Sequence, residues 1–582
     1  METELTAELV ADAVTPAEPR ISPDGREVAY VVGGALWLAS TGPLGVTGSG
    51  LRWSPDSQWL YYADAGHLHR ISPAAKEKLA DGVEDCVPLE DGRVVLVTKA
   101  PASDQDPKVW SEPPPVNGLA LLEDGEVRPL DVLPGRHIID IARRPGDELL
   151  AVLTRATPDQ DPVHPTTELH LVAPDTGHVE HLGETELLAH SPVWWRSGED
   201  WRVAYLANIE PIGGLAVFDA DRRNLTDGLP RCPVELVQSP DGEPLVVFEE
   251  GLDTVLYRLT GGTFQRLLAH QGSLSALSVS STEIAVLAGT AYEPRNVHAG
   301  PPEGPLKQLS DTRPELRGID WGTQERLSYQ ASDGLDLDGL LILPSGRTRA
   351  DGPFSLITIP HGGPYGRYAD ELSLHWFPSA QWFAAAGHAV FLPNPRGGRG
   401  HGHEFAASVA GAVGGAEWTD VLTGIDLLIE QGVADPGRLG IGSWSHGGFF
   451  SAWAVTQTGR FKAALMGAGI SDWGMLVATG EEGVLESGLG GGTYWTDRRL
   501  PAELSPVTHA AKVSTPVLIV HGENDTNVPL SQAICFHRAL RHHGVPHEFV
   551  VYPREGHRIS ERAHQLDLLR RMRDWFAVLL AR

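Results

Sequence analysis

The sequence predicts two domains, an all-β domain followed by an α/β domain with a mostly parallel sheet. The chain has 582 residues, whereas single hydrophobic cores stop growing near about 250–300 residues. Between Pro19 and Gly300, short apolar runs alternate with clusters of turn residues, a pattern typical of many short strands. Beyond Glu315, strand-like runs alternate with helical ones, which predicts a doubly wound sheet.

A recurring turn divides the first half into units. It is clearest at Ser22–Gly25, Ser54–Ser57 and Ser239–Gly242, and weaker versions begin at residues 89, 144, 197 and 280. These seven turns are 32 to 55 residues apart, a period that suits a blade of several strands. The spacing predicts a seven-bladed β-propeller over residues 17–314. A pair of β-sandwiches is the alternative.

The second half, residues 315–582, carries the strand and helix pattern of the α/β domain. Leu356–Pro360 and Val517–Val520 are expected strands, and Glu417–Glu430 has apolar residues on one helical face. Another amphipathic helix is expected near Glu561–Ala581. The segment 1–16 contains a short helical run and is expected to pack on the C-terminal domain.

Composition excludes several classes of function. Lys+Arg 46 against Asp+Glu 76 give a net charge of −30, so neither nucleic acid nor an anionic membrane is an expected partner. No run of about 18 apolar residues exists, and the acidic start has no signal region, so a cytoplasmic protein is expected. The cysteines Cys86, Cys232 and Cys535 are too few for a disulfide framework or a four-cysteine zinc site. Neither metal nor cofactor is expected.

The strongest chemical signal is the stretch Gly442–Gly448, which reads GSWSHGG. It follows an expected strand and precedes a helical run, so Ser445 is expected on a sharp turn with its hydroxyl above the sheet. The usual pattern has Gly two residues before the nucleophile, where this chain has Ser443. The alternative is a glycine-rich turn with an incidental serine.

Two later loops supply partners for Ser445. Asp525 follows the strand Val517–Val520, and His557 lies in a loop after the run Glu548–Tyr552. The chain order Ser, Asp, His is that of an α/β-hydrolase. In this interpretation His557 is the general base and Asp525 orients its imidazole.

A fourth part is an oxyanion hole, which needs two donors aimed at one point. The stretch Pro360–Gly366 follows a strand and is rich in glycine. We expect the backbone N–H groups of Gly363 and His446 to be the two donors. The alternative is an ordinary turn.

At these motifs the chain resembles the prolyl oligopeptidase family of serine peptidases, in particular its acylaminoacyl-peptidase branch. The resemblance rests on the blade turns, on the HGGP loop at His361–Pro364, on Asn394–Gly400, on the elbow and on the stretch His521–Pro529. It implies an N-terminal propeller and a C-terminal α/β-hydrolase domain. Ser443 and His446 stand where the family commonly has Gly and Tyr.

The resemblance also implies a substrate pocket. Trp473 and Val528 match wall residues around the side chain that precedes the scissile bond, and Asn527 falls where the family often has a polar residue touching the substrate carbonyl. Leu476 stands where dipeptidyl peptidases have an aromatic ring. For Trp473 the alternative is plain core packing.

The expected function is hydrolysis of peptide or amide bonds of short peptides through an acyl-enzyme, in an acylaminoacyl-peptidase-like or aminopeptidase-like manner. One alternative is an amidase or esterase acting on a small molecule such as an amide-containing antibiotic, because the same triad serves all of these reactions. The other is a catalytically silent propeller that binds proteins. The expected partner is a short peptide or small amide, and a homo-oligomer is an open alternative to a monomer.

Overall fold

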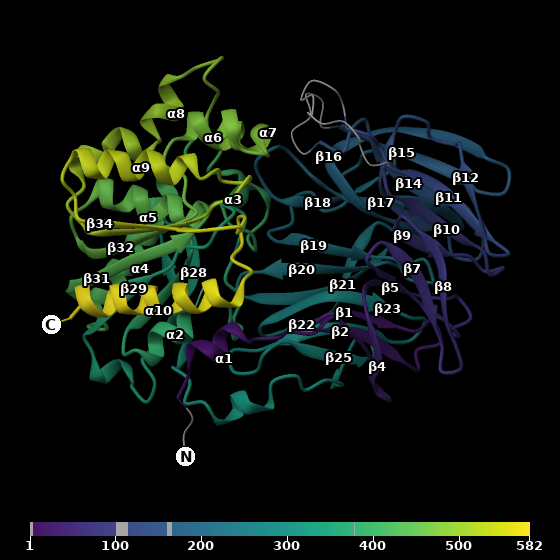
Figure 1. Cartoon of the computed structure of the whole chain (residues 1–582), viewed down its shortest axis with the longest axis horizontal. Coiled ribbons are helices and arrows are strands. Elements are labelled where there is room, and N and C mark those ends of the chain that lie inside the picture. Colours follow the sequence, from purple (N-terminus) through teal and green to yellow (C-terminus); the bar gives the residue numbers. More distant parts are fainter. Residues whose placement is uncertain (1–3, 101–113, 160–165, 378, 582) are drawn as a thin grey trace.

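The computed structural model describes residues 4–100, 114–159, 166–377 and 379–581, and the backbone but not the side chains of Val484 and Leu485. The two halves of the chain lie side by side, an all-β region and a region in which helices cover a sheet (Figure 1). Residues 1–3 of the segment 1–16 lie outside the described residues. Within the described chain, no helix has the length and apolar character needed to cross a membrane.

The N-terminal region is propeller-like, with antiparallel sheets built from strands that follow one another in sequence. The first three sheets contain β1 (Ala17–Ile21), β2 (Val28–Val32), β3 (Ala35–Leu38) and β4 (Gly42–Thr47); β5 (Ser49–Trp53), β6 (Leu60–Asp64), β7 (His67–Ile71) and β8 (Lys76–Asp81); β9 (Val83–Pro88), β10 (Val94–Thr98), β11 (Gly118–Glu123) and β12 (Glu126–Leu130).

The next three sheets contain β13 (His137–Arg143), β14 (Leu150–Arg155), β15 (Thr166–Ala173), β16 (His178–Ser197), β17 (Asp200–Asn208) and β18 (Leu215–Asp219); β19 (Cys232–Val237), β20 (Leu245–Glu250), β21 (Asp253–Thr260) and β22 (Thr263–His270); β23 (Ser273–Val279), β24 (Ile284–Gly289), β25 (Asn296–Gly300) and β26 (Lys307–Gln308). The first sheet meets the last, since the Ile21 amide donates to Ser278 Oγ at 3.0 Å. This contact joins the two ends of the series of sheets.

The prediction of seven blades was wrong, because the described residues form six such sheets. The turns at residues 144 and 197 both belong to the fourth sheet, which has six strands. Strand β16 is continuous over 20 residues and pairs with β15 along its first part and with β17 along the rest. The turn after Ser197 therefore joins two strands of one sheet and does not begin a new one.

The clearest predicted turns join the first and second strands of their sheets, and their side chains explain how they close. Ser22 Oγ donates to Asp24 Oδ1 at 2.6 Å and accepts from the Glu27 amide at 3.0 Å, which closes the turn before β2. Gly25 has φ +74°, a left-handed conformation that glycine adopts without a steric penalty. Ser54 makes the same contact with its own aspartate, Asp56, at 2.5 Å.

The C-terminal region has the α/β-hydrolase arrangement around one eight-stranded sheet of order β27-β28-β30-β29-β31-β32-β33-β34. The first two strands are antiparallel to their neighbours and the others run parallel. The strands are β27 (Gln324–Gln330), β28 (Asp336–Ile342), β29 (Phe354–Thr358), β30 (Ala389–Asn394), β31 (Ala434–Trp444), β32 (Phe461–Gly467), β33 (Val517–Gly522) and β34 (His547–Tyr552).

The helices flank this sheet on both faces (Figure 1). They are α1 (Ala7–Ala11), α2 (Ala380–Ala385), α3 (His403–Ala407), α4 (Ala416–Glu430), α5 (His446–Gln457), α6 (Trp473–Thr479), α7 (Gly483–Gly490), α8 (Arg499–Glu503), α9 (Ser531–His542) and α10 (Arg562–Leu579), with 3-10 helices at Pro314–Gly318, Arg349–Asp351 and Pro506–Lys512.

Alternate residues of the central strands point into two separate cores. Ile519 of β33 packs with helices α4, α5 and α9, whereas Leu518 packs with α2 and α10. Burial on both faces explains the continuous apolar runs of these strands. Gly440 of β31 lets α10 approach closely, because a Cβ there would lie 2.9 Å from the Phe576 ring. Helix α1 packs in the same core as α10, and its neighbour Asp12 pairs with Arg562.

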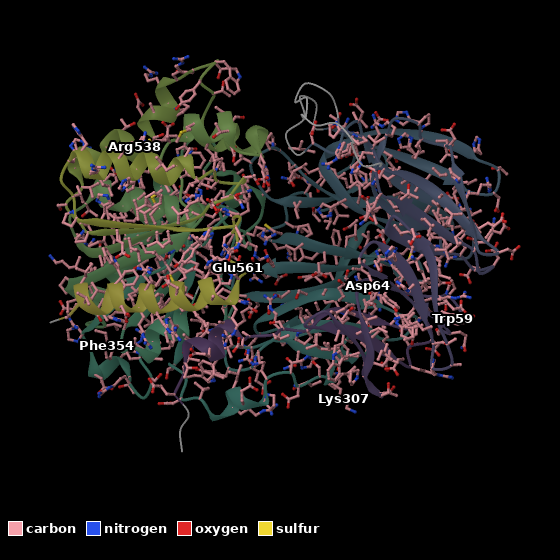
Figure 2. All side chains as sticks on the ribbon, viewed as in Figure 1. Trp59, Asp64, Lys307, Phe354, Arg538 and Glu561 are labelled. Atoms are coloured by element: carbon pink, nitrogen blue, oxygen red, sulfur yellow. The ribbon has the colours of Figure 1, made fainter. Side chains whose placement is uncertain are left out.

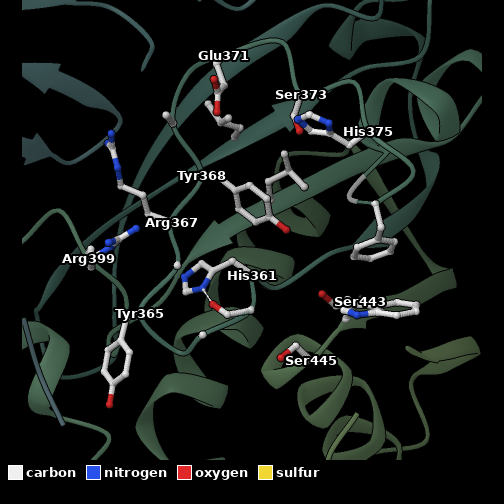
Figure 3. Close-up of a pocket in the computed structure, with 18 of the residues that line it drawn as sticks. His361, Tyr365, Arg367, Tyr368, Glu371, Ser373, His375, Arg399, Ser443 and Ser445 are labelled. Carbon is white, nitrogen blue, oxygen red and sulfur yellow. Dashed lines mark hydrogen bonds between the residues drawn. The ribbon is translucent and has the colours of Figure 1, made fainter. Parts of the chain in front are cut away.

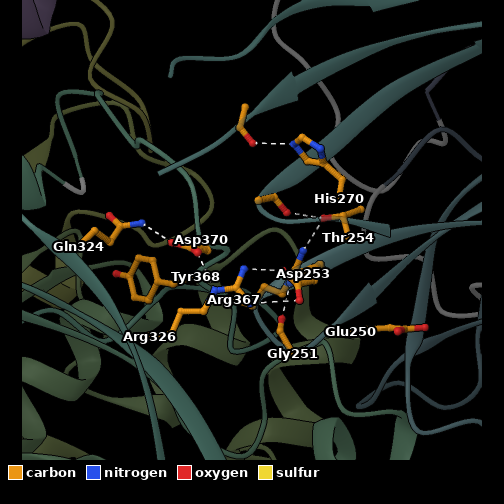
Figure 4. Close-up of polar contacts among 12 residues, drawn as sticks. Glu250, Gly251, Asp253, Thr254, His270, Gln324, Arg326, Arg367, Tyr368 and Asp370 are labelled. Atoms are coloured by element: carbon orange, nitrogen blue, oxygen red, sulfur yellow. Dashed lines mark hydrogen bonds and ion pairs between the residues drawn. The ribbon is translucent and has the colours of Figure 1, made fainter. Parts of the chain in front are cut away.

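A charged contact zone joins the two regions (Figure 4). Arg326 of β27 binds Asp253 of β21 at 2.5 Å and Asp370 at 2.6 Å. Arg367 donates to Thr254 Oγ1 at 2.9 Å and to the main-chain oxygen of Asp253 at 3.0 Å. The segment 367–370 is therefore held by the propeller-like region.

Charged side chains also cover the outer surface of the molecule. Lys307 of β26 and Arg538 of α9 are exposed and lie far apart (Figure 2).

Candidate active site

Ser445 lies on a sharp turn between β31 and α5. Its backbone has φ +62° and ψ −128°, a conformation that is costly for any residue with a Cβ. The turn is held because the Ser445 amide donates to the main-chain oxygen of Gly467 at 2.9 Å. The side chain is thereby raised above the carboxyl end of the parallel strands, where α/β folds bind ligands.

Two glycines after Ser445 are required by close packing. A Cβ on Gly447 would lie 2.1 Å from Ser443 Oγ, and one on Gly448 would lie 2.3 Å from the main-chain oxygen of Gly467. The Ser443 hydroxyl is buried and donates to the main-chain oxygen of Pro360. Ser443 therefore ties the turn to the end of the strand that leads into the glycine-rich loop.

Ser445, His557 and Asp525 form a hydrogen-bonded chain. Ser445 Oγ lies 2.9 Å from His557 Nε2, and His557 Nδ1 lies 2.8 Å from Asp525 Oδ2. Trp444 Nε1 donates to the main-chain oxygen of His557 at 2.8 Å, which anchors the loop after β34. The structure therefore brings together the three residues that the sequence predicts.

Asp525 is buried but its carboxylate is well supplied with donors. Oδ1 accepts the Val528 amide at 2.9 Å, and Oδ2 lies 3.4 Å from the Nε2 of the buried His521. Burial alone would raise the pKa of Asp525, but hydrogen bonds from His521 and His557 outweigh it and lower that pKa. The group is therefore ionised at neutral pH and suited to orient an imidazole.

The glycine-rich loop lies against Ser445. A Cβ on Gly362 would lie 3.6 Å from the Cβ of Ser445. Gly363 has φ +119°, and a Cβ there would lie 2.2 Å from the Tyr365 amide nitrogen, so only glycine fits. Gly363 and His446, the two predicted oxyanion donors, both line a cavity that contains Ser445.

This cavity has a volume of about 340 Å³ and contains all four predicted pocket residues, Trp473, Leu476, Asn527 and Val528. Its other lining residues are Gly363, Tyr365, Ser445, His446, Ile470, Glu482, Glu486, Leu489 and His557. Trp473 packs on the buried ring of His446, with 6.1 Å between ring centroids. Most of the wall is apolar, as expected of a pocket for a side chain.

Sequence reasoning missed Glu482 and Glu486, which come from the start and middle of α7. Partial loss of water around the Glu482 carboxylate and then the charge of Glu481 raise the pKa of Glu482. The available signal was a pair of glutamates a few residues after the helix that carries Trp473 and Leu476. Without the fold, nothing indicated that this pair faces Ser445.

A second cavity, of about 640 Å³, also has Ser445 in its wall (Figure 3). Trp376 and Phe377 form an aromatic wall against Trp444, with 4.9 Å between the centroids of the two Trp rings. His375 and Arg558 bring polar groups to the same space. Among the described residues, those lining the two cavities all come from the C-terminal region, so the propeller-like region contributes no lining side chain there.

One buried histidine lies behind the glycine-rich loop. His361 lines the larger cavity, and burial lowers its pKa to about 4. Its Nδ1 lies 3.0 Å from the main-chain oxygen of Gly362. The imidazole is therefore neutral at pH 7 and supports the loop.

Comparison with known proteins places this geometry in context. Over its full length the chain is 26% identical to an uncharacterised peptidase, YuxL, of Bacillus subtilis, covering 98% of this chain and 99% of that one. Acylamino-acid-releasing enzymes and dipeptidyl-peptidase 5 proteins are matched over 33–47% of their length. The chain therefore spans less than half of those relatives.

Two solved structures share the whole fold. An acylaminoacyl peptidase of Pyrococcus horikoshii has a TM-score of 0.83 at 20% identity, covering 99% of this chain and 98% of that one. A puromycin-hydrolyzing peptidase of Mycobacterium tuberculosis has a TM-score of 0.75 at 20% identity, covering 100% and 97%. Residues 375–582 match the model of the prolyl oligopeptidase family. This part of the chain is therefore a domain of the prolyl oligopeptidase family.

Proposed function

We propose that the chain is a serine peptidase that hydrolyses short peptides through an acyl-enzyme intermediate. The observation that carries the proposal is the hydrogen-bonded chain Ser445–His557–Asp525 at the carboxyl ends of the sheet strands. Ser445 is exposed to two cavities that meet at its side chain. A nucleophile, a base and an orienting carboxylate are the groups that acyl transfer requires.

In the proposed mechanism, His557 Nε2 takes the proton of Ser445 as the serine oxygen attacks the substrate carbonyl carbon. The carbonyl oxygen becomes an oxyanion and accepts hydrogen bonds from the amides of Gly363 and His446. When the C–N bond breaks, His557 returns the proton to the leaving nitrogen. Water then attacks the acyl-enzyme in the same way and releases Ser445. Asp525 stays ionised and stabilises the imidazolium.

The two cavities divide the substrate between them. The apolar walls of the 340 Å³ cavity suit the side chain that precedes the scissile bond. The 640 Å³ cavity, with its aromatic wall at Trp376 and Trp444, is the place for the leaving group.

A carboxylate in the smaller cavity favours substrates with a free amino group. The exposed Glu482 and the buried Glu486 are both part of its wall, and a carboxylate in the wall attracts a cationic amino group. This favours aminopeptidase-like over acylaminoacyl-peptidase-like cleavage.

Labelling with a fluorophosphonate tests the catalytic assignment. Wild type is expected to react at Ser445, and Ser445→Ala is expected not to react. Ser373→Ala is the matched control, because Ser373 lines the same large cavity and has no place in the proposed mechanism. Equal labelling of wild type and Ser445→Ala, or no labelling of wild type, would show a silent hydrolase domain.

The substrate preference has its own test. Glu482→Gln is expected to lower kcat/KM about tenfold for a leucine anilide with a free amino group, which corresponds to about 1.4 kcal/mol. The N-acetylated anilide should be unaffected. Glu503→Gln, an exposed change on α8, is the control. An equal loss on both anilides would refute the role of Glu482.

A second candidate is hydrolysis of a non-peptide amide. It is supported by the similarity in fold to the puromycin-hydrolyzing peptidase. Puromycin is therefore the first small molecule to assay beside the anilides. Turnover of puromycin by wild type and not by Ser445→Ala would support this function, and resistance of puromycin together with rapid anilide turnover would count against it.

A further inference from the structure

A histidine and carboxylate cluster lies in the fourth sheet of the propeller-like region, away from Ser445. Strands β15 and β16, neighbours in Figure 1, place His170 directly opposite His181. Glu168 precedes His170 by two residues, so its side chain lies on the same face of β15. Ligand atoms of these three residues all lie within 4.8 Å of one another.

The distances match those of a metal centre. Glu168 Oε2 lies 3.5 Å from His170 Nε2 and 3.4 Å from His181 Nε2. In a tetrahedral zinc site with bonds of 2.0–2.2 Å, neighbouring ligand atoms lie about 3.4 Å apart. The two distances from Glu168 Oε2 therefore already match edges of such a tetrahedron, and all three ligand atoms lie within 4.8 Å of one another.

We propose that Glu168 Oε2, His170 Nε2 and His181 Nε2 bind a zinc ion. Imidazole and carboxylate are ligands that Zn²⁺ takes readily. Water, or the hydroxyl of Thr154, completes the coordination. Thr154 Oγ1 lies 3.0 Å from His170 Nε2, so the ion displaces or replaces that hydrogen bond.

The surroundings fix the proposed ligands in place. Arg136 pairs with Glu168 Oε1 at 3.1 Å, which holds the carboxylate while Oε2 faces the imidazoles. Arg136 Nε also donates to Thr154 Oγ1 at 3.2 Å. His170 is 5% exposed, and a buried imidazole is favoured in its neutral form, which is the form that binds metal. His181 is exposed, so an ion can enter from solvent.

A comparison within the chain shows what distinguishes this cluster. Glu555, Glu561 and His564 lie within the same limit of one another, but both carboxylate oxygens of Glu555 already accept hydrogen bonds from backbone amides. Glu555 accepts from the amides of Ser560 and Glu561 and lies 2.7 Å from His564 Nδ1. Glu561 pairs with Arg554. That cluster is a hydrogen-bonded turn, whereas Glu168 Oε2 faces two imidazole nitrogens.

The zinc site shares no residue with the cavities at Ser445. It joins β15 to β16, the long strand that holds the six-stranded sheet together. The ion is therefore expected to stabilise this sheet and to leave the peptidase reaction unchanged. Failure of the zinc proposal and failure of the proposed function are thus seen in different measurements.

Cobalt substitution tests the site in the full chain. Chelator-treated wild type is expected to bind one Co²⁺ with the intense visible d–d absorption of a tetrahedral complex, and Zn²⁺ should displace it. His181→Ala and Glu168→Gln are expected to lose this absorption and to weaken Zn²⁺ binding at least about tenfold. Zn²⁺ should raise the Tm of wild type and not that of the variants.

His178→Ala is the matched control, because His178 is exposed on the same strand and lies outside the cluster. It should bind Co²⁺ like wild type. His181→Ala removes an exposed side chain and is expected to fold, which circular dichroism and fluorophosphonate labelling verify. Equal Zn²⁺ affinity in wild type, His181→Ala and Glu168→Gln, or the absence of tetrahedral absorption in wild type, would overturn the proposal.

Discussion

Replacing Asp525 by Asn changes the tautomer of His557 without changing the shape of the site. The Val528 amide donates to Oδ1 at 2.9 Å, so the asparagine keeps its oxygen at that position and turns its NH₂ group toward His557 Nδ1. Nδ1 must then accept a hydrogen bond, and the imidazole proton moves to Nε2. That proton faces Ser445 Oγ across 2.9 Å, where the mechanism needs a lone pair.

The expected loss is large because the base is disabled in every turnover. A wrong tautomer in a triad of this kind lowers kcat about 10⁴-fold, which is about 5.4 kcal/mol of transition-state stabilisation. The assay is steady-state hydrolysis of a chromogenic leucine anilide, with the rate of fluorophosphonate labelling as a second measure. KM should change little, since Asp525 does not line either cavity.

Glu523→Gln is the control for Asp525→Asn, because Glu523 is exposed in the same loop. It should retain wild-type kcat. A fall in kcat of less than about tenfold in Asp525→Asn, in a variant with the wild-type circular dichroism spectrum, would refute the assignment of Asp525 as the orienting group.

Three further changes have defined outcomes. Burial opposes ionisation of Glu555, but hydrogen bonds from backbone amides and from His564 lower its pKa to about 2. The ionised carboxylate therefore adds about 3 kcal/mol to the free energy of unfolding above pH 4.5, and this contribution is lost as the pH falls toward 2. The difference in unfolding free energy between wild type and Glu555→Gln should shrink over that range in urea titrations. Gly447→Ala places a Cβ 2.1 Å from Ser443 Oγ, so fluorophosphonate labelling should fall at least a hundredfold, and normal labelling would contradict the packing argument. Arg326→Ala removes the ion pair with Asp253 and should lower the free energy of unfolding by about 1 kcal/mol. Limited proteolysis between the two regions should become faster.

The fold of the α/β half can be predicted well from the sequence because its signals are local. Strand and helix periods, the glycines around Ser445 and the positions of Asp525 and His557 just after expected strands all lie in short stretches of chain. Parallel strands bring their carboxyl ends to one edge, so residues far apart in sequence can be placed together without knowing any contact. This is why the hydrogen-bonded chain could be anticipated.

Pairing between strands is harder to predict from the sequence, as the wrong number of blades shows. The turn at Ser197 has the composition of a blade start, but only the register of β16 with both β15 and β17 reveals one six-stranded sheet. The same limitation hid the Glu168 and His181 contact, which depends on that register. Glu482 was missed because it reaches the cavity through the packing of α6 against α7, which no local pattern encodes.

One stretch of chain links catalysis to the shape of the whole molecule. Gly363 lies at its start, and Trp376, in the wall of the large cavity, lies at its end. In its middle, Arg367 donates to Thr254 Oγ1 and the Asp370 amide donates to the main-chain oxygen of Leu252, both in the propeller-like region. A change in the separation of the two regions would therefore act on the predicted oxyanion donor and on a cavity wall through the same stretch of chain.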